Sequence, residues 1–448
     1  MTSKNIKVFA ALVAGTVATA GSWSVADAAT LEEAVGLAIS TNPRVGVVSY
    51  DRQAVQYELR QGIALYYPQV DLEANTGPEW TKNNTTDGQG YNNGRWLWSN
   101  SATLTLSQLI FDGHFASNEV AKQEARVSSA AYRVSEAAEF VGLDAVEVYL
   151  EVMRQRDRLL NAEQNVLTHQ NTLGDVQLRA QAGGGNVADV RQAEARLASS
   201  ESALTQIRGA LNDAEYRYIN VVGVAPDTLS APTVPYDMLP ASLEDSVAAA
   251  ISNSPTVAFS RADVAAAAAE AAQQTAAYWP DVRLQLQGAA ANNDDGSDQS
   301  AYNASALIVV RWNIYRGGAD TARVKEFKHR LAESTEQMLI NERQVAEDAR
   351  VSWNGIQTAR QSVEILKREV DANLSTRDIY RQQFDIGQRG LLDLLDADNE
   401  LFLSRDSLIT ATYAEMFAAY RLLATTGMLV EALGLQEPAT AMQMTADE

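Results

Sequence analysis

Residues 187–222 read VADVRQAEARLASSESALTQIRGALNDAEYRYINVV. Two sets of side chains recur there every seven residues, large ones first and mostly small ones three positions behind: Val190, Leu197, Leu204, Leu211 and Tyr218, then Ala193, Ser200, Ile207, Ala214 and Val221. An ordinary amphipathic helix on a globular core would also bury one stripe. A strict 3.5-residue period over this length instead favours a coiled coil. The stretch therefore predicts a helix over 187–222 with one continuous buried seam.

The partner of this helix is expected to be the segment just before it. Residues 113–182 contain no proline and are rich in strong helix formers, which predicts a second helix. Such a helix would be roughly 100 Å long at about 1.5 Å per residue. Gly183, Gly184 and Gly185 then interrupt the pattern, and so short a break forces the two helices into an antiparallel hairpin. This half of the chain is predicted to be a rod.

The other half repeats the same plan. Residues 30–35 match 242–247 at a spacing of 212 positions, and from Phe111 onward the spacing is 204, so that 111–113 matches 315–317. The spacing changes only once, between Val70 and Phe111. Register kept over so long a distance is the signature of an internal repeat. The chain is therefore interpreted as a tandem duplication.

The predicted organisation follows from these spacings. Its parts are a signal peptide (1–28), a first repeat (29–223), a Pro-rich linker (224–241), a second repeat (242–434) and a flexible C-terminal tail (435–448). The first repeat is expected to contain helices over 31–40, 45–66, 113–182 and 187–222 and strands over 69–82 and 95–111. The second is expected to contain strands over 281–291 and 302–315 and helices over 317–386 and 391–430.

The signal peptide is predicted from three features. Lys4 and Lys7 precede an apolar run over 8–20, and Ala26-Asp27-Ala28 has the small-x-small pattern of a cleavage site. The apolar run is too short for a bilayer, which needs about 20 residues. Export is the expected consequence.

Four segments alternate apolar and polar residues with a period of two. Leu284 and Leu286 alternate with glutamines, and Leu104 and Leu106 with threonines, as in a sheet between two unlike environments. Trp80, Trp96 and Trp98 flank a polar loop, as aromatic residues do at a membrane interface, although a soluble core would also explain them. Membrane barrels need at least about eight strands. Several chains must therefore share one barrel, and this reasoning leaves their number open.

The signal peptide, the duplicated plan and the turns at 111–113 and 315–318 resemble the TolC family of outer-membrane efflux and secretion ducts. The resemblance covers about 30–434. It implies a mostly α fold with membrane β structure: a homotrimer with a twelve-stranded β-barrel in the outer membrane lipid of a Gram-negative bacterium. A twelve-helix α-barrel would continue it through the periplasm. The implied partners are a periplasmic adaptor (membrane fusion) protein and an ATP-driven or proton-driven inner-membrane transporter.

The segment 384–397, FDIGQRGLLDLLDA, resembles the periplasmic tip of the family's inner helix pair. Two aspartates three positions apart narrow the entrance there, and Asp393 and Asp396 match them. The spacing puts both carboxylates on one helix face, and trimer symmetry would bring them together on the axis. Without the resemblance, an acidic pair at a helix N-terminus is adequately explained by the helix dipole. With it, the pair is expected to form the gate.

The resemblance also implies a latch and a docking surface. Arg389 matches the latch arginine, Asp189 an acidic partner, and Phe384 stands where a tyrosine is expected, so that one hydrogen bond is missing. The hairpin tips at Gly183, Gly184, Gly185, Gly387 and Gly390 are expected to dock the adaptor.

Several functions are excluded or kept as alternatives. The formal net charge of −21 disfavours nucleic acid as a partner. The three histidines show no metal-ligand spacing, no nucleotide-binding or nucleophile motif is present in its required context, and no enzyme activity, metal or cofactor is expected. Many drug-efflux members of the TolC family carry a lipid-modified cysteine, which this chain lacks, so the resemblance points toward type I protein secretion. Drug efflux with a proton-driven pump is kept as the alternative. An exported coiled-coil adhesin or envelope spacer is the alternative of another class.

Overall fold

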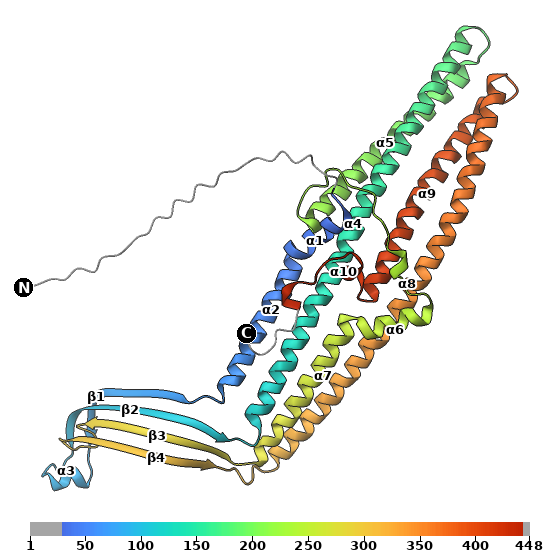
Figure 1. Cartoon of the computed structure of the whole chain (residues 1–448). Helices are drawn as coiled ribbons and strands as arrows, with labels where there is room; N and C mark the ends of the chain where they lie inside the picture. Colours follow the sequence, from blue (N-terminus) through green and yellow to red (C-terminus); the bar gives the residue numbers. More distant parts are fainter. Residues whose placement is uncertain (1–28, 442–448) are drawn as a thin grey trace, which may run out of the picture.

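The computed structural model describes residues 29–441, a long helical rod with a four-stranded sheet at one end (Figure 1). The predicted signal peptide over 1–28 lies outside the described residues. The first repeat contains α1 (Leu31–Thr41), α2 (Pro43–Ala64), β1 (Gln69–Thr81), α3 (Asn84–Gly88), β2 (Arg95–Phe111), α4 (Phe115–Gln181) and α5 (Val187–Val222). The second contains α6 (Leu243–Asn253), α7 (Pro255–Gln273), β3 (Asp281–Asn292), β4 (Ser300–Arg311), α8 (Ala319–Asp385), α9 (Leu391–Thr425) and α10 (Leu429–Ala432).

The duplication is visible element by element. The two long helices α4 and α8 each have 67 residues, and α8 begins and ends 204 positions after α4. The elements α6, α7 and β3 each begin 212 positions after α1, α2 and β1. The spacing changes within the strand hairpins, where the first repeat has a longer loop that contains α3. The tandem duplication predicted from the sequence is confirmed.

Each long helix forms a hairpin with the helix that follows it. The α5 helix packs along α4, and α9 packs along α8 (Figure 1). In α5 the small members of the seven-residue pattern are buried, including Ala193, Ser200 and Ala214. Small side chains at these positions let the two backbones approach closely. The predicted seam therefore exists along the whole of α5.

The four strands form one antiparallel sheet in the order β1-β2-β3-β4. Residues paired across strands share a face, so the register defines an apolar face and a mainly polar face. The apolar face includes Val70, Leu72, Leu104, Leu106, Leu284, Leu286, Ile308 and Val310. The polar face includes Asp71, Glu73, Thr103, Thr105, Arg283, Gln285, Gln287 and Arg311. Within residues 29–441, the outer edges of β1 and β4 pair with no other strand.

The three tryptophans near the first strand loop lie together on the apolar face. Trp80 pairs directly with Trp96, and Trp98 pairs with Pro78. All three side chains are exposed, so they do not belong to a soluble core. The Trp98 indole donates a hydrogen bond of 3.0 Å to the Thr76 hydroxyl, which lies at the same end of the sheet.

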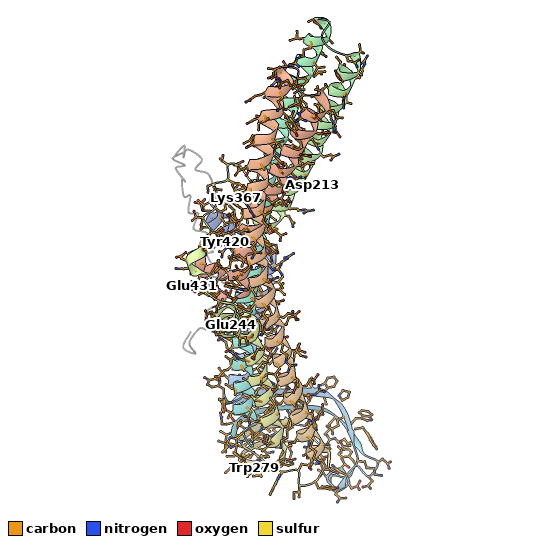
Figure 2. The ribbon with its side chains drawn as sticks, turned by 90° about the vertical axis from the view of Figure 1, so that its right-hand side faces the viewer. Asp213, Glu244, Trp279, Lys367, Tyr420 and Glu431 are labelled. Atoms are coloured by element: carbon orange, nitrogen blue, oxygen red, sulfur yellow. The ribbon has the colours of Figure 1, made fainter. Side chains whose placement is uncertain are left out.

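The largest hydrophobic core lies near the middle of the rod, where Figure 2 labels Tyr420. Tyr149, Tyr218 and Tyr420 are fully buried there. The Tyr149 hydroxyl lies 2.7 Å from the Ser230 carbonyl oxygen, and the Tyr420 hydroxyl donates to the Thr233 carbonyl at 3.2 Å. These contacts fasten the Pro-rich linker against the helices of both repeats.

Two predicted element ends were wrong by more than two residues. The last helix was expected to run to residue 430, but α9 ends at Thr425, because Gly427 takes a left-handed conformation (φ 67°) and turns the chain into α10. The last strand was expected to reach Tyr315, but β4 ends at Arg311. The Trp312 indole donates instead to the Tyr278 carbonyl at 3.2 Å, which draws this segment away from the sheet.

Two segments expected to be irregular are ordered. The loop after β1 contains α3, because the Asn83 side chain caps the backbone N–H groups of Thr85 and Thr86. The flexible tail was predicted from residue 435, but its described part, 435–441, packs on the rod. The Ser135 hydroxyl donates to Glu437 at 2.9 Å, and Leu435 contacts the central core. The remaining tail residues, 442–448, lie outside the described residues.

Gly427→Ala is expected to lower the stability of the folded chain. A Cβ atom at this position would lie 2.8 Å from the Asn253 carbonyl oxygen, and the backbone is left-handed. Strain and steric overlap together should cost about 2–4 kcal/mol. Gly434→Ala is the matched control, because Gly434 has the same φ of 67° with no atom within 4 Å and should cost only about 1–2 kcal/mol. Thermal unfolding of both variants, followed by circular dichroism, tests this; equal losses would contradict it.

Candidate functional site

The two hairpin turns lie at the end of the rod farthest from the sheet (Figure 1). Gly183 and Gly387 occupy equivalent positions in them and are left-handed, with φ of 79° and 75°. Gly185 has a different reason to be glycine, since a Cβ atom there would lie 2.8 Å from the Ala180 backbone nitrogen. The turn geometry alone therefore explains these three glycines.

The other two glycines of the predicted docking surface have no such explanation. A Cβ atom at Gly184 would meet nothing closer than 3.8 Å, and one at Gly390 nothing closer than 4.0 Å. Neither residue has a left-handed backbone. Both positions can accept a side chain without strain, which makes them suitable places to probe a contact with another protein.

A small hydrophobic core holds the two hairpins together near these turns. It consists of Val176, Ala193, Phe384, Leu391, Leu394 and Leu395. Phe384, predicted to belong to the latch, is only 6% exposed and fills this core. The Arg179 guanidinium stacks over its ring at 4.2 Å. Phe384 therefore binds one hairpin to the other by packing and stacking.

Two arginines cross between the hairpins. Arg179 of α4 donates to the Phe384 carbonyl at 3.0 Å and lies 3.4 Å from the Asp385 carboxylate. Arg381 of α8 reaches the other way and pairs with the Asp175 carboxylate of α4. These contacts are charge-assisted and join residues about 200 positions apart in the sequence.

The predicted latch residues Arg389 and Asp189 do not contact each other within the chain. Arg389 interacts with its own hairpin: its guanidinium lies 4.0 Å from the Tyr380 ring centroid and 3.4 Å from the Asp393 carboxylate. It also donates to the Gln383 side chain at 3.1 Å. Asp189 forms no ion pair among residues 29–441. A latch between Arg389 and Asp189 would have to join neighbouring subunits.

The two predicted gate aspartates are held differently. Both lie in the first turns of α9, with side chains about half exposed. Asp393 is contacted by Arg389 of its own hairpin, whereas Asp396 forms a 2.7 Å ion pair with Arg196 of α5. Asp396 therefore also links the hairpins, a role that its spacing from Asp393 did not predict.

A third aspartate, Asp398, points into the protein. It is only 5% exposed, and its Oδ2 atom has no hydrogen-bond partner. It lines a polar cavity of about 330 Å³ between α4, α8 and α9 together with Asn161, Gln164, Asn165, Thr168, Arg377 and Arg405. Burial raises the pKa of Asp398 to about 6, against the opposing effect of Arg377 and Arg381.

The packing of the hairpins should consequently weaken as pH rises. The pKa of Asp398 is above its ordinary value of 3.8, so the packed state binds the proton more tightly than the separated state. Its contribution is complete below pH 3.8 and is lost as pH rises through about 6, a change of about 2–3 kcal/mol. Asp398→Asn should raise the melting temperature at pH 7.5 and reduce its dependence on pH. Asp371→Asn, an exposed change on α8, is the control; equal pH profiles for both variants would contradict the expectation.

The comparisons with known proteins decide the family. The family described as outer membrane efflux protein matches residues 34–224 and 247–428. The chain belongs to this family. Among relatives, it is 28% identical over 335 residues to the outer membrane efflux protein BepC of Brucella suis, covering 74% of this chain and 73% of BepC. It is 24% identical over 410 residues to the alkaline protease secretion protein AprF of Pseudomonas aeruginosa, covering 88% and 84%.

Solved structures show the same fold. The open state of the MtrE outer membrane channel of Neisseria gonorrhoeae superposes with a TM-score of 0.73 at 15% identity, covering 89% of each chain. As an outer membrane efflux protein, the chain is a passive channel of the outer membrane that extends into the periplasm, and not an enzyme. Like other outer membrane efflux proteins, it forms homotrimers that work with periplasmic adaptors and inner-membrane transporters. Membership of this family replaces the adhesin or envelope-spacer alternative.

Residues 29–441 contain neither a membrane-spanning helix nor a metal-binding cluster. None of their helices is long and apolar enough to cross a membrane. The same residues contain no cluster of three or more side chains suited to hold a metal ion.

Proposed function

We propose that three copies of the chain close their sheets into one twelve-stranded barrel, through the outer edges of β1 and β4. The support is the sheet itself, which has one apolar and one polar face and two unpaired edges. Unpaired backbone groups in lipid cost several kcal/mol each, so the edges need partners. The apolar face then contacts lipid, and the polar face lines the channel. The paired hairpins of three chains continue the channel as a twelve-helix tunnel.

The far end of the hairpins is the gated entrance in this proposal. Asp393 and Asp396 of three chains surround the axis there, and the ion pairs of Arg179, Arg381 and Arg196 hold each inner hairpin against the outer one. Energy for opening comes from the inner-membrane partner. The supporting observation is that nearly all of these contacts are polar and partly exposed, which makes them separable without opening a large core.

The adaptor is proposed to dock on the hairpin tips. Gly184→Arg and Gly390→Arg place a long charged side chain at positions where the fold has room. We expect each to reduce export at least tenfold by obstructing docking, while trimer formation and conductance in bilayers stay at wild-type levels. Ser199→Arg, an exposed change farther along α5, is the control. Normal export by both glycine variants would remove the tips from the docking surface.

For the cargo, we propose protein secretion driven by an ATP-dependent exporter. The observation that supports this proposal is the similarity to the alkaline protease secretion protein AprF, which spans 88% of this chain. The second candidate is efflux of small toxic compounds, favoured by the higher identity to the efflux protein BepC. Both fit the same duct, because the helical hairpins and sheet do not depend on what passes through them.

Expression of this chain in a host that lacks its own outer-membrane duct distinguishes protein secretion from small-molecule efflux. Restored secretion of an exporter's protein substrate, without restored resistance to detergents and dyes, supports protein secretion. Restored resistance alone supports small-molecule efflux and overturns the secretion proposal. The Gly184→Arg variant serves as the control that depends on adaptor docking.

A further inference from the structure

A hollow of about 660 Å³ lies where the polar face of the sheet meets the helices, at the end of the rod where Figure 2 labels Trp279. Four arginines line it: Arg283 and Arg311 from the sheet, Arg316 from the β4–α8 connection and Arg323 from α8. Arg316 precedes the first residue of α8 and Arg323 lies in its second turn, and both line the hollow. Three aspartates line the same hollow, Asp112, Asp281 and Asp320, so its formal charge is +1 (four arginines less three aspartates) in a chain whose net charge is −21.

The acidic side chains of the hollow are already engaged. Asp112 accepts hydrogen bonds from the backbone nitrogens of Phe115 and Ala116, at 3.0 and 2.8 Å, and so caps α4. Asp281 is contacted by Arg283 at 2.9 Å. Asp320 lies 3.7 Å from Arg316.

Two guanidinium groups remain without an acidic partner. Arg311 and Arg323 are exposed, and neither forms an ion pair among residues 29–441. Both reach the same hollow, one from the end of β4 and one from the second turn of α8. A guanidinium presents a planar set of donors that fits carboxylate and phosphate oxygens.

We propose that this hollow is an anion-binding zone inside the channel, which takes phosphate or carboxylate groups of passing cargo. Arg311 and Arg323 contact the anion. Arg283 and Arg316 are paired with Asp281 and Asp320, and so keep those two carboxylates from the two unpaired guanidinium groups. Because the hollow opens to the lumen only if the three sheets close as proposed above, this assignment rests on the proposed barrel. Trimer symmetry then places three such hollows around the lumen, between the membrane barrel and the tunnel. Cargo would meet an acidic gate at one end and a basic zone at the other.

The proposed anion-binding zone can be tested by measuring how tripolyphosphate blocks the single-channel current. The tripolyphosphate is added on the side of the strand loops. The basic zone is then reached without passing the acidic gate. We expect wild-type current to be blocked at micromolar to millimolar concentration, more weakly in high salt because of screening. Arg311→Gln/Arg323→Gln should raise the half-blocking concentration about tenfold or more, since each charge-assisted contact carries about a factor of ten.

Lys325→Gln/Lys328→Gln is the matched control. It also removes two positive charges, both near the start of α8, at exposed residues that do not line the hollow. Tripolyphosphate should block the current of this control variant at the same concentrations as that of the wild type. Equal weakening in both double variants would mean a general charge effect and would overturn the proposal, as would a wild type that tripolyphosphate does not block. A protein that inserts but never conducts would instead count against the proposed barrel, so the two failures are distinguishable.

Discussion

Arg179→Ala/Arg381→Ala is expected to open the entrance of the trimeric channel at the hairpin tips. In the intact chain, these two arginines join the hairpins through the Phe384 carbonyl, Asp385 and Asp175, and Arg179 also stacks on the Phe384 ring. Each contact is partly exposed, so we assign it about 1 kcal/mol or less. Their joint loss, about 2–3 kcal/mol per chain, shifts the ratio of open to closed hairpins about 30- to 140-fold. Single-channel recordings should show a higher open probability and larger conductance than wild type.

The control for this variant is also an Arg→Ala substitution, at an arginine that makes no contact between the hairpins. Arg191→Ala removes an arginine whose partner, Glu194, lies on the same exposed helix, so no contact between hairpins is lost. Its conductance should equal that of wild type. Closure that survives the loss of both Arg179 and Arg381 would contradict this expectation. The entrance would then be held shut by the core around Phe384, by the Asp396–Arg196 ion pair or by contacts between subunits.

Asp393→Asn/Asp396→Asn is expected to abolish the cation preference of the channel. Six carboxylates around a threefold axis attract cations and repel anions, and low ionic strength strengthens this effect. The wild type should be cation-selective in a salt gradient, and the double variant should show a reversal potential near zero. Asparagine keeps the size of each side chain, so a change in selectivity reports on charge.

The ion pair between Asp396 and Arg196 makes a second comparison informative. Arg196→Gln frees the Asp396 carboxylate from α5 without removing it. If Asp396 contributes to the gate through its charge, this variant should be more cation-selective than wild type. An Asp393/Asp396 variant that remains cation-selective would place the selectivity elsewhere in the channel.

The part of the candidate site within one hairpin could be predicted from the sequence. The spacing of Asp393 and Asp396 puts both carboxylates on one helix face, and the glycine breaks locate both turns. The contacts between the hairpins could not be predicted, because Arg179 and Asp385, or Arg196 and Asp396, are about 200 positions apart and no local pattern relates them. The burial of Asp398 could have been predicted only weakly, from its position in the helix. Two positions after Asp396, it must point away from the gate face of the helix.

By itself, the sequence determined the duplication, the two long hairpins with their buried seams, and the alternating strands. These features depend on periodicity, proline placement and glycine breaks, which act between residues close together in the chain. Only the tertiary structure decided which residues fasten one hairpin to the other, where α9 ends, that residues 435–441 pack on the rod, and that four arginines surround one hollow. These depend on side chains brought together from distant segments, where distance and burial determine the energy.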